Sequence, residues 1–293
     1  MDTVLAKTFI EVIASGSFAD AAKRLFVSQS AISLRIKSLE EQLGRKVFLR
    51  SKTGITLTPA GHQFQRYAQS LLQVWEEAKQ QVAVPEGYRD VLVIAGEHSL
   101  WNRLLVHWLP LMANNMPDTA FRAEVARPDR ITRQMIEGTV DIAVMYTPQV
   151  RPGLCVEPLF DDSLVMVSTN ENVEGIDPKY VFIDWGEEFA AFHASNFPDH
   201  RHPRMTFSIG PMTVNYLLNV GGTAYMPKRL IEPLLTSEKL YLVPGMPTFE
   251  FPVHVVWRDK VKESLIDEAL THLRKTAKRS IADQLPAPFW MNG

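Results

Sequence analysis

The sequence predicts an α/β protein with an all-α N-terminal head, in which a winged helix-turn-helix precedes a long linker helix and two α/β subdomains. Three observations support this fold class. The first 45 residues or so contain three short segments with helical apolar spacing, one long amphipathic segment follows, and strand-like and helix-like segments alternate from about residue 90. We therefore expect a head at 1–58, a linker and hinge at 59–88, and a body at 89–293, whose first subdomain is formed by about 89–162 and 249–293 and whose second is formed by about 163–248.

The head is divided into helices by its capping residues. An apolar stripe runs from Val4 to Ile13 and ends at the Ser15–Ser17 turn. Ser17 is suited to cap the helix FADAAKRLF, and Ser28 to cap a third helix that ends near Leu43, before Gly44. The turn between the second and third helices has the length found in a helix-turn-helix.

A hairpin and a long helix follow. KVFLRSKTGITLT alternates around Thr53-Gly54, which indicates the two strands of a wing. Thr58 and Pro59 are good first residues for the next helix. Its apolar positions follow a heptad spacing and predict a seam for pairing with a second copy, with packing on the helix's own domain as the alternative: Phe64, Ala68, Leu71, Trp75, Ala78 and Val82.

The body alternates strands and helices. VLVIA, FRAEVA and VDIAVMY are separated by two helical segments, which predicts parallel strands with right-handed crossovers. A second α/β unit runs from KYVFIDW to KLYLVP, and FPVHVVWR with ESLIDEALTHLRKTA closes the chain.

Charge and composition limit the function classes. The first 60 residues hold nine Lys and Arg against five acids, a net +4, whereas the remainder is −6. A basic segment on an acidic body indicates that the N-terminal part faces a polyanion. Cys155 is the only cysteine, and neither a signal peptide nor an apolar run of membrane-spanning length is present, so we expect a cytoplasmic protein with no membrane association.

The third helix has a face suited to base edges. Ile32, Ile36, Leu39 and Leu43 mark its buried side, and the opposite side is small, polar and free of acids in its N-terminal half. Short side chains on such a face reach base edges in a major groove, where Gln29 is able to bind adenine bidentately. We expect contacts with double-stranded DNA, to bases or phosphates, from Ser28, Gln29, Ser30, Ala31, Ser33, Leu34, Arg35, Lys37, Arg50 and Lys52.

These residues resemble a known family. Gly16-Ser17-Phe18, Ser28-Gln29-Ser30-Ala31-Ile32-Ser33 and Leu57-Thr58-Pro59-Ala60-Gly61 match the N-terminal domain of LysR-type transcriptional regulators, and LRIKSLEEQLG resembles the HdfR-like branch of that family. The resemblance implies a regulator that acts as a homodimer or homotetramer, with RNA polymerase as a candidate partner. It also implies a body resembling periplasmic binding proteins, with a small-molecule effector in its cleft. Leu34 departs from the family's usual Arg at that position and is suited to a thymine methyl.

The effector cleft is expected beyond the carboxyl ends of the strands, where helix N-termini present free N–H groups. Arg127 is a candidate for holding a carboxylate, with a surface role as the alternative. The candidate effector residues are Ser99, Leu100, Trp101, Arg127, Pro128, Thr147, Trp185, Met212 and Thr213, of which the tryptophans could equally be core residues.

Other readings are weaker. Asp199, His200 and His202 lie in the proline-bounded loop PDHRHP, and with His193 they include no second close ligand pair, so no metal is expected. Cys155 lies in a strand-like segment and is expected to be a packing residue rather than a redox sensor. No phosphate loop or catalytic motif is present, which disfavours an enzyme or a cofactor, and a solute-binding protein would need a signal peptide and would have no use for a basic three-helix head. A regulator that acts by occupancy alone, without an effector, stays open.

Overall fold

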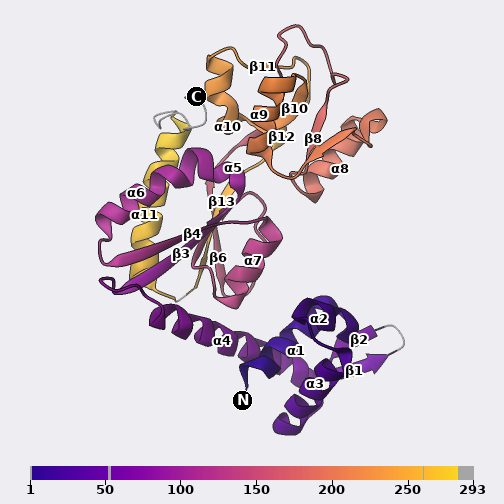
Figure 1. The fold of residues 1–293 in the computed structure, drawn as a ribbon, viewed down its shortest axis with the longest axis vertical. Helices are drawn as coiled ribbons and strands as arrows, with labels where there is room; N and C mark the ends of the chain where they lie inside the picture. Colours follow the sequence, from indigo (N-terminus) through magenta and orange to yellow (C-terminus); the bar gives the residue numbers. More distant parts are fainter. Residues whose placement is uncertain (1, 52–53, 260, 283–293) are drawn as a thin grey trace. The chain divides into compact units, whose positions relative to one another are not determined.

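The computed structural model describes residues 2–51, 54–259 and 261–282, without the side chains of Arg50 and Ser51. The predictions for Lys52 and for the Arg50 side chain therefore lie outside the described residues. The chain forms two compact units (Figure 1). The first comprises Met1–Glu86 with Ile136–Thr139, and the second comprises Gly87–Met135 with Val140–Gly293.

Three short helices form the head of the first unit: α1 (Thr3–Ser15), α2 (Phe18–Leu25) and α3 (Gln29–Leu43). The capping prediction is confirmed, because Ser17 and Ser28 accept the backbone N–H groups of Asp20 and Ala31, and Gly44 ends α3 in the left-handed region. Ile32, Ile36 and Leu39 are buried, but Leu43 at the end of the stripe is exposed. The aromatic rings of Phe9, Phe18, Phe48 and Phe64 contact one another in this core.

The wing and the long helix complete the first unit. Strands β1 (Phe48–Ser51) and β2 (Gly54–Leu57) pair antiparallel, and α4 (Pro59–Val82) follows. Thr58 fixes this junction, because its hydroxyl donates to the Lys46 carbonyl at 2.7 Å and accepts the Gly61 N–H at 2.9 Å. The residue after Ala60 must be glycine, since a Cβ at Gly61 would overlap the Val47 carbonyl.

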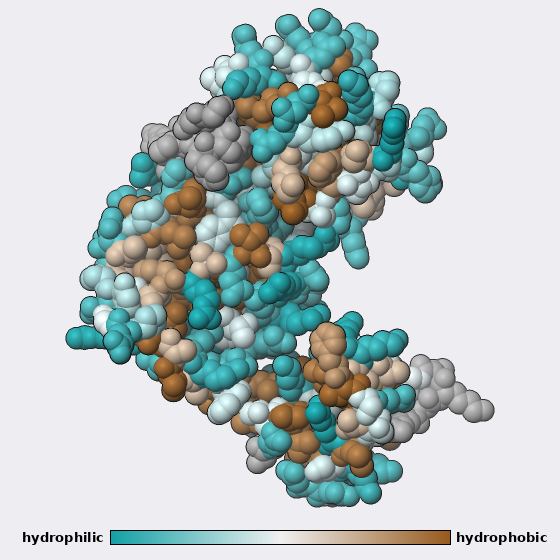
Figure 2. All heavy atoms as spheres, viewed as in Figure 1, coloured by the Kyte–Doolittle hydropathy of each residue, from teal (hydrophilic) through white to brown (hydrophobic). Residues whose placement is uncertain are grey.

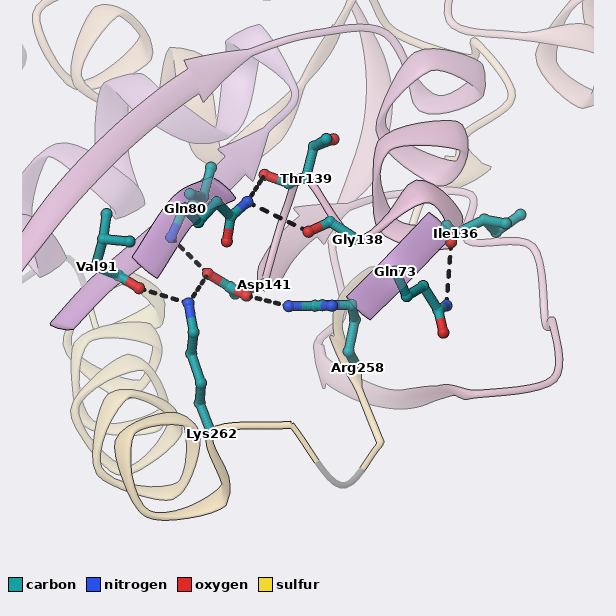
Figure 3. A network of polar contacts seen from close by, with 10 residues as sticks. Gln73, Gln80, Val91, Ile136, Gly138, Thr139, Asp141, Arg258 and Lys262 are labelled. Carbon is teal, nitrogen blue, oxygen red and sulfur yellow. Dashed lines mark hydrogen bonds and ion pairs between the residues drawn. The ribbon is translucent and has the colours of Figure 1, made fainter. Parts of the chain in front are cut away.

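Two glutamines of α4 bind the end of α7 (Pro128–Glu137) and the turn that follows it. Gln73 donates to the Ile136 carbonyl at 3.1 Å, and Gln80 donates to the carbonyls of Gly138 and Thr139 at 3.2 and 3.1 Å (Figure 3). Through these contacts Ile136–Thr139 forms part of the first unit.

The second unit consists of two lobes, each built on a sheet. The first-lobe sheet has the strand order β4-β3-β5-β13-β6. Helices α6 and α11 cover one face of it and α7 covers the other (Figure 1). Its elements are β3 (Asp90–Gly96), α5 (His98–Leu100), the π-helix η1 (Trp101–Leu105), α6 (Val106–Asn115), β4 (Thr119–Val125), α7 (Pro128–Glu137), β5 (Ile142–Met145), β6 (Leu154–Phe160), β13 (Val253–Arg258) and α11 (Glu263–Ile281).

The second-lobe sheet has the order β11-β7-β10-β8-β9, with β12 also paired to β7. Its elements are β7 (Ser163–Ser168), β8 (Val181–Ile183), α8 (Glu187–Asn196), the 3₁₀-helix η2 (Pro198–His200), β9 (Met205–Phe207), α9 (Gly210–Val220), β10 (Thr223–Pro227), α10 (Lys228–Thr236), β11 (Tyr241–Leu242) and β12 (Phe249–Glu250). Phe249 and Glu250 thus belong to the second sheet.

The sheets are mixed, which corrects the parallel prediction. The expected parallel pairing holds for β3 with β4 and β5, and for β8 with β9 and β10. However, β13 is antiparallel to β5 and β6, and β7 is antiparallel to β10. The reason is that the chain crosses between the lobes twice, and a returning strand enters its sheet from the opposite end.

A buried carboxylate joins four parts of the first lobe. Asp141 accepts the Arg258 guanidinium at 2.6 Å, the Lys262 ammonium at 3.0 Å and the Val93 N–H at 2.9 Å, and Lys262 also donates to the Val91 carbonyl (Figure 3). Because all of these donors converge on one fully buried side chain, Asp141 fixes β3, β13 and the start of α11 around the beginning of β5.

No helix among the described residues is long and apolar enough to cross a membrane. On the face shown in Figure 2, hydrophobic side chains reach the surface in separate patches among hydrophilic ones.

Candidate functional site

The outer face of α3 is exposed, as predicted. Leu34 is 67% exposed, and the other exposed candidates are Ser28, Gln29, Ser30 and Lys37. Ala31, Ser33 and Arg35 are only partly exposed. The exposed candidates occupy the first two and a half turns of the helix, so their side chains share one surface without an acidic residue among them.

The side chains of Ser28 and Gln29 differ in the hydrogen bonds that they make within the head. The Ser28 hydroxyl accepts the Ala31 N–H at 3.2 Å and lies 2.9 Å from the Ser30 hydroxyl, so it is partly occupied in holding the helix start. The Gln29 side chain has no hydrogen-bond partner among the described residues, which leaves its donor and acceptor available to a base.

Arg35 and Lys37, the two cationic residues of α3, also have partners within the head. Arg35 points toward α1 and donates to the Thr8 hydroxyl at 3.5 Å, a long bond. The Lys37 ammonium lies 3.8 Å from Glu41, in an exposed pair that water screens. Lys37 is therefore the better placed of the two for a phosphate.

Phe26 is an exposed residue that the sequence reasoning missed. It ends α2 with φ of 54°, in the left-handed region, and 94% of its surface is exposed. A bulky residue in this conformation is uncommon and costs backbone energy. The position of Phe26 in the sequence could have indicated its exposure, since it directly precedes the Val27-Ser28 turn into α3.

The predicted seam of α4 divides into two parts. Phe64 and Ala68 are buried in the head core and Leu71 packs against it, so these three positions contact their own domain rather than a second copy. Trp75, Ala78 and Val82 are exposed, Val82 to 89%. Tyr67 and Val74 extend this exposed apolar surface, which we call the α4 stripe.

A cavity of about 750 Å³ lies between the lobes of the second unit, at the predicted place. Its lining includes five of the candidate effector residues: Ser99, Arg127, Pro128, Thr147 and Trp185. The other four, Leu100, Trp101, Met212 and Thr213, are not in the lining.

Packing explains the four exceptions. Leu100 is wholly buried, and the Trp101 indole donates to the carbonyls of Gly96 and Glu124, both at 3.2 Å. Thr213 is buried and its hydroxyl turns back to the Ile209 carbonyl. Met212 is exposed outside the cavity. A helix that begins at a cleft presents only its first residues to it, and the sequence did not show where each helix begins.

Arg127 reaches across the cleft to the second lobe. Its guanidinium lies 3.1 Å from the Asp184 carboxylate, so the expectation that it holds a ligand carboxylate must compete with this pair. The pair is partly exposed and is worth little by itself.

Glu97 is a lining residue that the sequence reasoning did not select. Its Oε1 accepts the Tyr146 N–H at 2.8 Å, and its Oε2 has no hydrogen-bond partner among the described residues. Burial raises the pKa of Glu97 to about 7, against smaller opposing effects of the Tyr146 N–H and Arg127. Glu97 directly follows β3, so the rule that selected Ser99 could also have selected it.

A second cavity, of about 650 Å³, adjoins the chain crossings between the lobes. Buried Arg229 of the second lobe lies 3.6 Å from Asp162 and donates to the Ser99 carbonyl at 3.2 Å. Arg103 of the first lobe donates to the Arg229 carbonyl at 2.8 Å. These contacts tie α10 to η1 and hold the lobes together beside the cleft.

The weaker readings gain no support from side-chain geometry. In the part of the chain that the structure describes, no group of three His, Cys, Asp or Glu residues could hold a metal ion. His193 is buried and stacks on Tyr180, and burial lowers its pKa. Burial and nearby Asp259 raise the pKa of the Cys155 thiol, which disfavours the reactive thiolate.

These features define a class of protein: a winged helix-turn-helix head joined to a two-lobed body with a ligand-sized cleft. Residues 5–62 match the model of the bacterial regulatory helix-turn-helix protein, lysR family, and residues 85–278 match the LysR substrate binding domain. The chain therefore belongs to the LysR family, whose members are transcriptional regulators with a DNA-binding head and an effector-binding domain.

Individual relatives agree over nearly the whole chain. The HTH-type transcriptional regulator HdfR of Yersinia pestis (strain Pestoides F) is 29% identical over 294 residues, covering 96% of this chain and 99% of the relative. ArgP from Mycobacterium tuberculosis (TM-score 0.55, 21% identity, 94% of this chain and 97% of that one) has a similar fold. So does LysG from Corynebacterium glutamicum with bound effector Arg (TM-score 0.55, 19% identity, 98% and 100%).

Proposed function

We propose that this regulator reads a pseudo-palindromic DNA site as a homo-oligomer, with one α3 helix in each of two successive major grooves. The observation that carries the proposal is the outer face of α3, where Gln29, Ser30 and Leu34 are exposed together without a carboxylate. Two such helices read half-sites about one helical turn apart. In this arrangement Gln29 contacts a base edge, Lys37 contacts a phosphate, and Leu34 contacts a thymine methyl.

The α4 stripe supports association through the linker helix. Its five apolar side chains are exposed within one protomer, and burying them against a second copy removes them from water. We propose a homodimer as the unit that binds DNA, assembled further into a homotetramer, in the cytoplasm where the chromosome lies. Because the protein is a transcriptional regulator, the proposal also includes contact with RNA polymerase.

The cavity between the lobes is the proposed effector site. An effector that binds one arrangement of the lobes more tightly than another shifts the balance between them, and so changes DNA binding or activation. LysG, a protein of the same fold, is described with a bound effector. The competing proposal is a regulator that acts by occupancy alone.

The test of DNA reading is a selection from random double-stranded DNA with the full-length protein at fixed, near-physiological salt. An interrupted palindrome with arms about one turn apart would support the proposal. Binding that only fades as salt rises, with no enriched sequence, would contradict it, because phosphate contacts alone behave in that way.

A matched pair of variants tests the role of Gln29. We expect Gln29→Ala to weaken binding to the selected site by about 1–3 kcal/mol and to relax the preference at one base pair, since a bidentate contact is lost. Gln42→Ala changes the same residue type on the exposed C-terminal turn of α3 and should leave the preference intact. Equal losses in both variants would show that Gln29 makes no base contact.

A further inference from the structure

The charges that line the effector cleft are strongly one-sided. Among the residues that the structure describes, five of those lining the cavity carry carboxylates, and Arg127 is the one Lys or Arg in the lining. Counting only Asp, Glu and Arg, five carboxyl groups against one guanidinium give a formal charge of −4, or −3 while Glu97, whose pKa is about 7, holds its proton. The carboxylates belong to Glu97, Asp129, Asp184, Glu187 and Glu188.

The groups of the cleft that would ordinarily attract an anion already lie next to carboxylates of the protein itself. Helix N-termini at the edge of an α/β sheet attract negative charge. Here Asp129 stands in the first turn of α7, and Glu187 and Glu188 stand in the first turn of α8. The cation Arg127 is likewise paired, with Asp184. An anionic effector would therefore meet helix ends and a guanidinium that the protein's own carboxylates already balance.

Two further features suit a cation. Glu97 presents Oε2 without a hydrogen-bond partner among the described residues, while the Tyr146 N–H holds Oε1 in place. Aromatic rings lie in the same lining, and their faces attract cations. Trp185 and Phe249 are partly exposed and have ring surface for a ligand, whereas Phe189 and Phe251 are buried behind them. The Trp185 indole is fixed by its bond to the Tyr225 carbonyl at 2.9 Å and meets Phe251 edge-on at 6.0 Å.

We propose that the effector of this regulator is a small organic cation, with an ammonium or guanidinium group that binds between Glu97 and Asp184 and an apolar part that packs on the aromatic rings. This inference rests on the proposed effector role of the cleft and adds its charge class. The cation displaces Arg127 from Asp184 or shares the carboxylate with it.

The test compares the affinities of small cations and small anions of similar size at the same ionic strength. Full-length protein is titrated calorimetrically with putrescine, agmatine and choline, and separately with glutarate and benzoate. We expect at least one of the cations to bind at least tenfold more tightly than either anion. Tighter binding of an anion would overturn the inference but leave the effector cleft standing. Binding of neither class would also overturn the inference about charge, and a well-defined selected DNA site would leave the DNA-reading proposal standing.

Variants locate the cation within the cleft. Glu97→Gln and Asp184→Asn should each weaken the best cation tenfold or more, whereas Glu171→Gln, an exposed acid of the second lobe outside the lining, should not. Arg127→Gln separates the two charge classes, because it removes the competitor for Asp184. It should leave cation binding unchanged or tighter, and a tenfold loss would mean that Arg127 holds an anionic group of the ligand.

Discussion

At the scale of single residues, Glu97 makes the stability of the second unit depend on pH. Its pKa is about 7 in the folded chain, against an ordinary value of 4.5, because burial disfavours the charged form. A group whose pKa is raised by folding favours the folded state most below its unfolded pKa. That contribution is lost as pH rises from about 4.5 to about 7, and the shift corresponds to roughly 3 kcal/mol.

We expect Glu97→Gln to remove this dependence. The amide oxygen still accepts the Tyr146 N–H, and no carboxyl remains to be ionised in the cleft. The variant should be more stable than the parent at pH 8, by up to about 3 kcal/mol, and should lose that advantage near pH 4. Urea unfolding at both pH values measures the difference, with the exposed Glu188→Gln as control. An equal change in stability at pH 4 and pH 8 would contradict the assignment.

The residues of the cleft were predictable only in part. The rule that ligands bind beyond the carboxyl ends of strands selected loops whose residues Ser99, Arg127, Thr147 and Trp185 line the cavity. It could not select Asp184 as the partner of Arg127, because the two lie on different lobes and 57 residues apart. Nor could it show that Leu100 points inward, since a one-residue difference in a helix start turns a side chain by about 100°.

At the scale of secondary-structure elements, α4 carries a testable surface. We expect Trp75→Lys to raise the dissociation constant of the oligomer at least tenfold, because it places a charge in the α4 stripe at a residue that is half exposed in the protomer. Sedimentation over a range of concentrations measures the constant. His62→Lys, an exposed change on the same helix outside the stripe, is the control. Unchanged association of Trp75→Lys would mean that the copies meet elsewhere.

The Asp141 network makes a second prediction at this scale. Asp141→Asn should lower the free energy of unfolding by about 3–5 kcal/mol, because it leaves the buried Arg258 guanidinium and the Lys262 ammonium without their carboxylate. Asp118→Asn, in an exposed pair with Arg89, should cost less than about 1 kcal/mol. Chemical denaturation compares the two, and similar losses would show that the network adds little.

Elements with local signals were predicted well. Asp20, Ala31 and Gly61 donate their N–H groups to the capping residues Ser17, Ser28 and Thr58, and a cap depends only on residues a few positions away. The direction of β13 was not predictable in this way, because it depends on where the chain returns from the second lobe. For a related reason the burial of Phe64 and Ala68 in the head core was only the alternative to pairing, since a heptad spacing does not say which apolar surface the helix covers.

At the scale of the whole molecule, the second lobe is an insertion in the chain of the first. The chain leaves the first lobe after β6 and returns before β13, and the Phe251 N–H donates to the Asp162 carbonyl at 2.8 Å where the two crossings meet. The strands of the second sheet therefore all come from one continuous segment, Ser163 to Glu250. The first sheet instead needs strands from both sides of that segment.

This arrangement fixes the order in which the body is completed during synthesis. Strand β13 lies between β5 and β6 in the first-lobe sheet. A nascent chain that ends before Val253 lacks β13, so β5 and β6 cannot yet be joined in one sheet. We expect a chain truncated after Glu250 to be cleaved rapidly by protease between β3 and β6 and more slowly between β7 and β12, whereas a chain ending at Ala282 resists in both. Equal resistance of both segments in the shorter chain would contradict this. The inserted lobe is thus complete first, whereas the first lobe, which begins earlier in the chain, is finished only when β13 has been made.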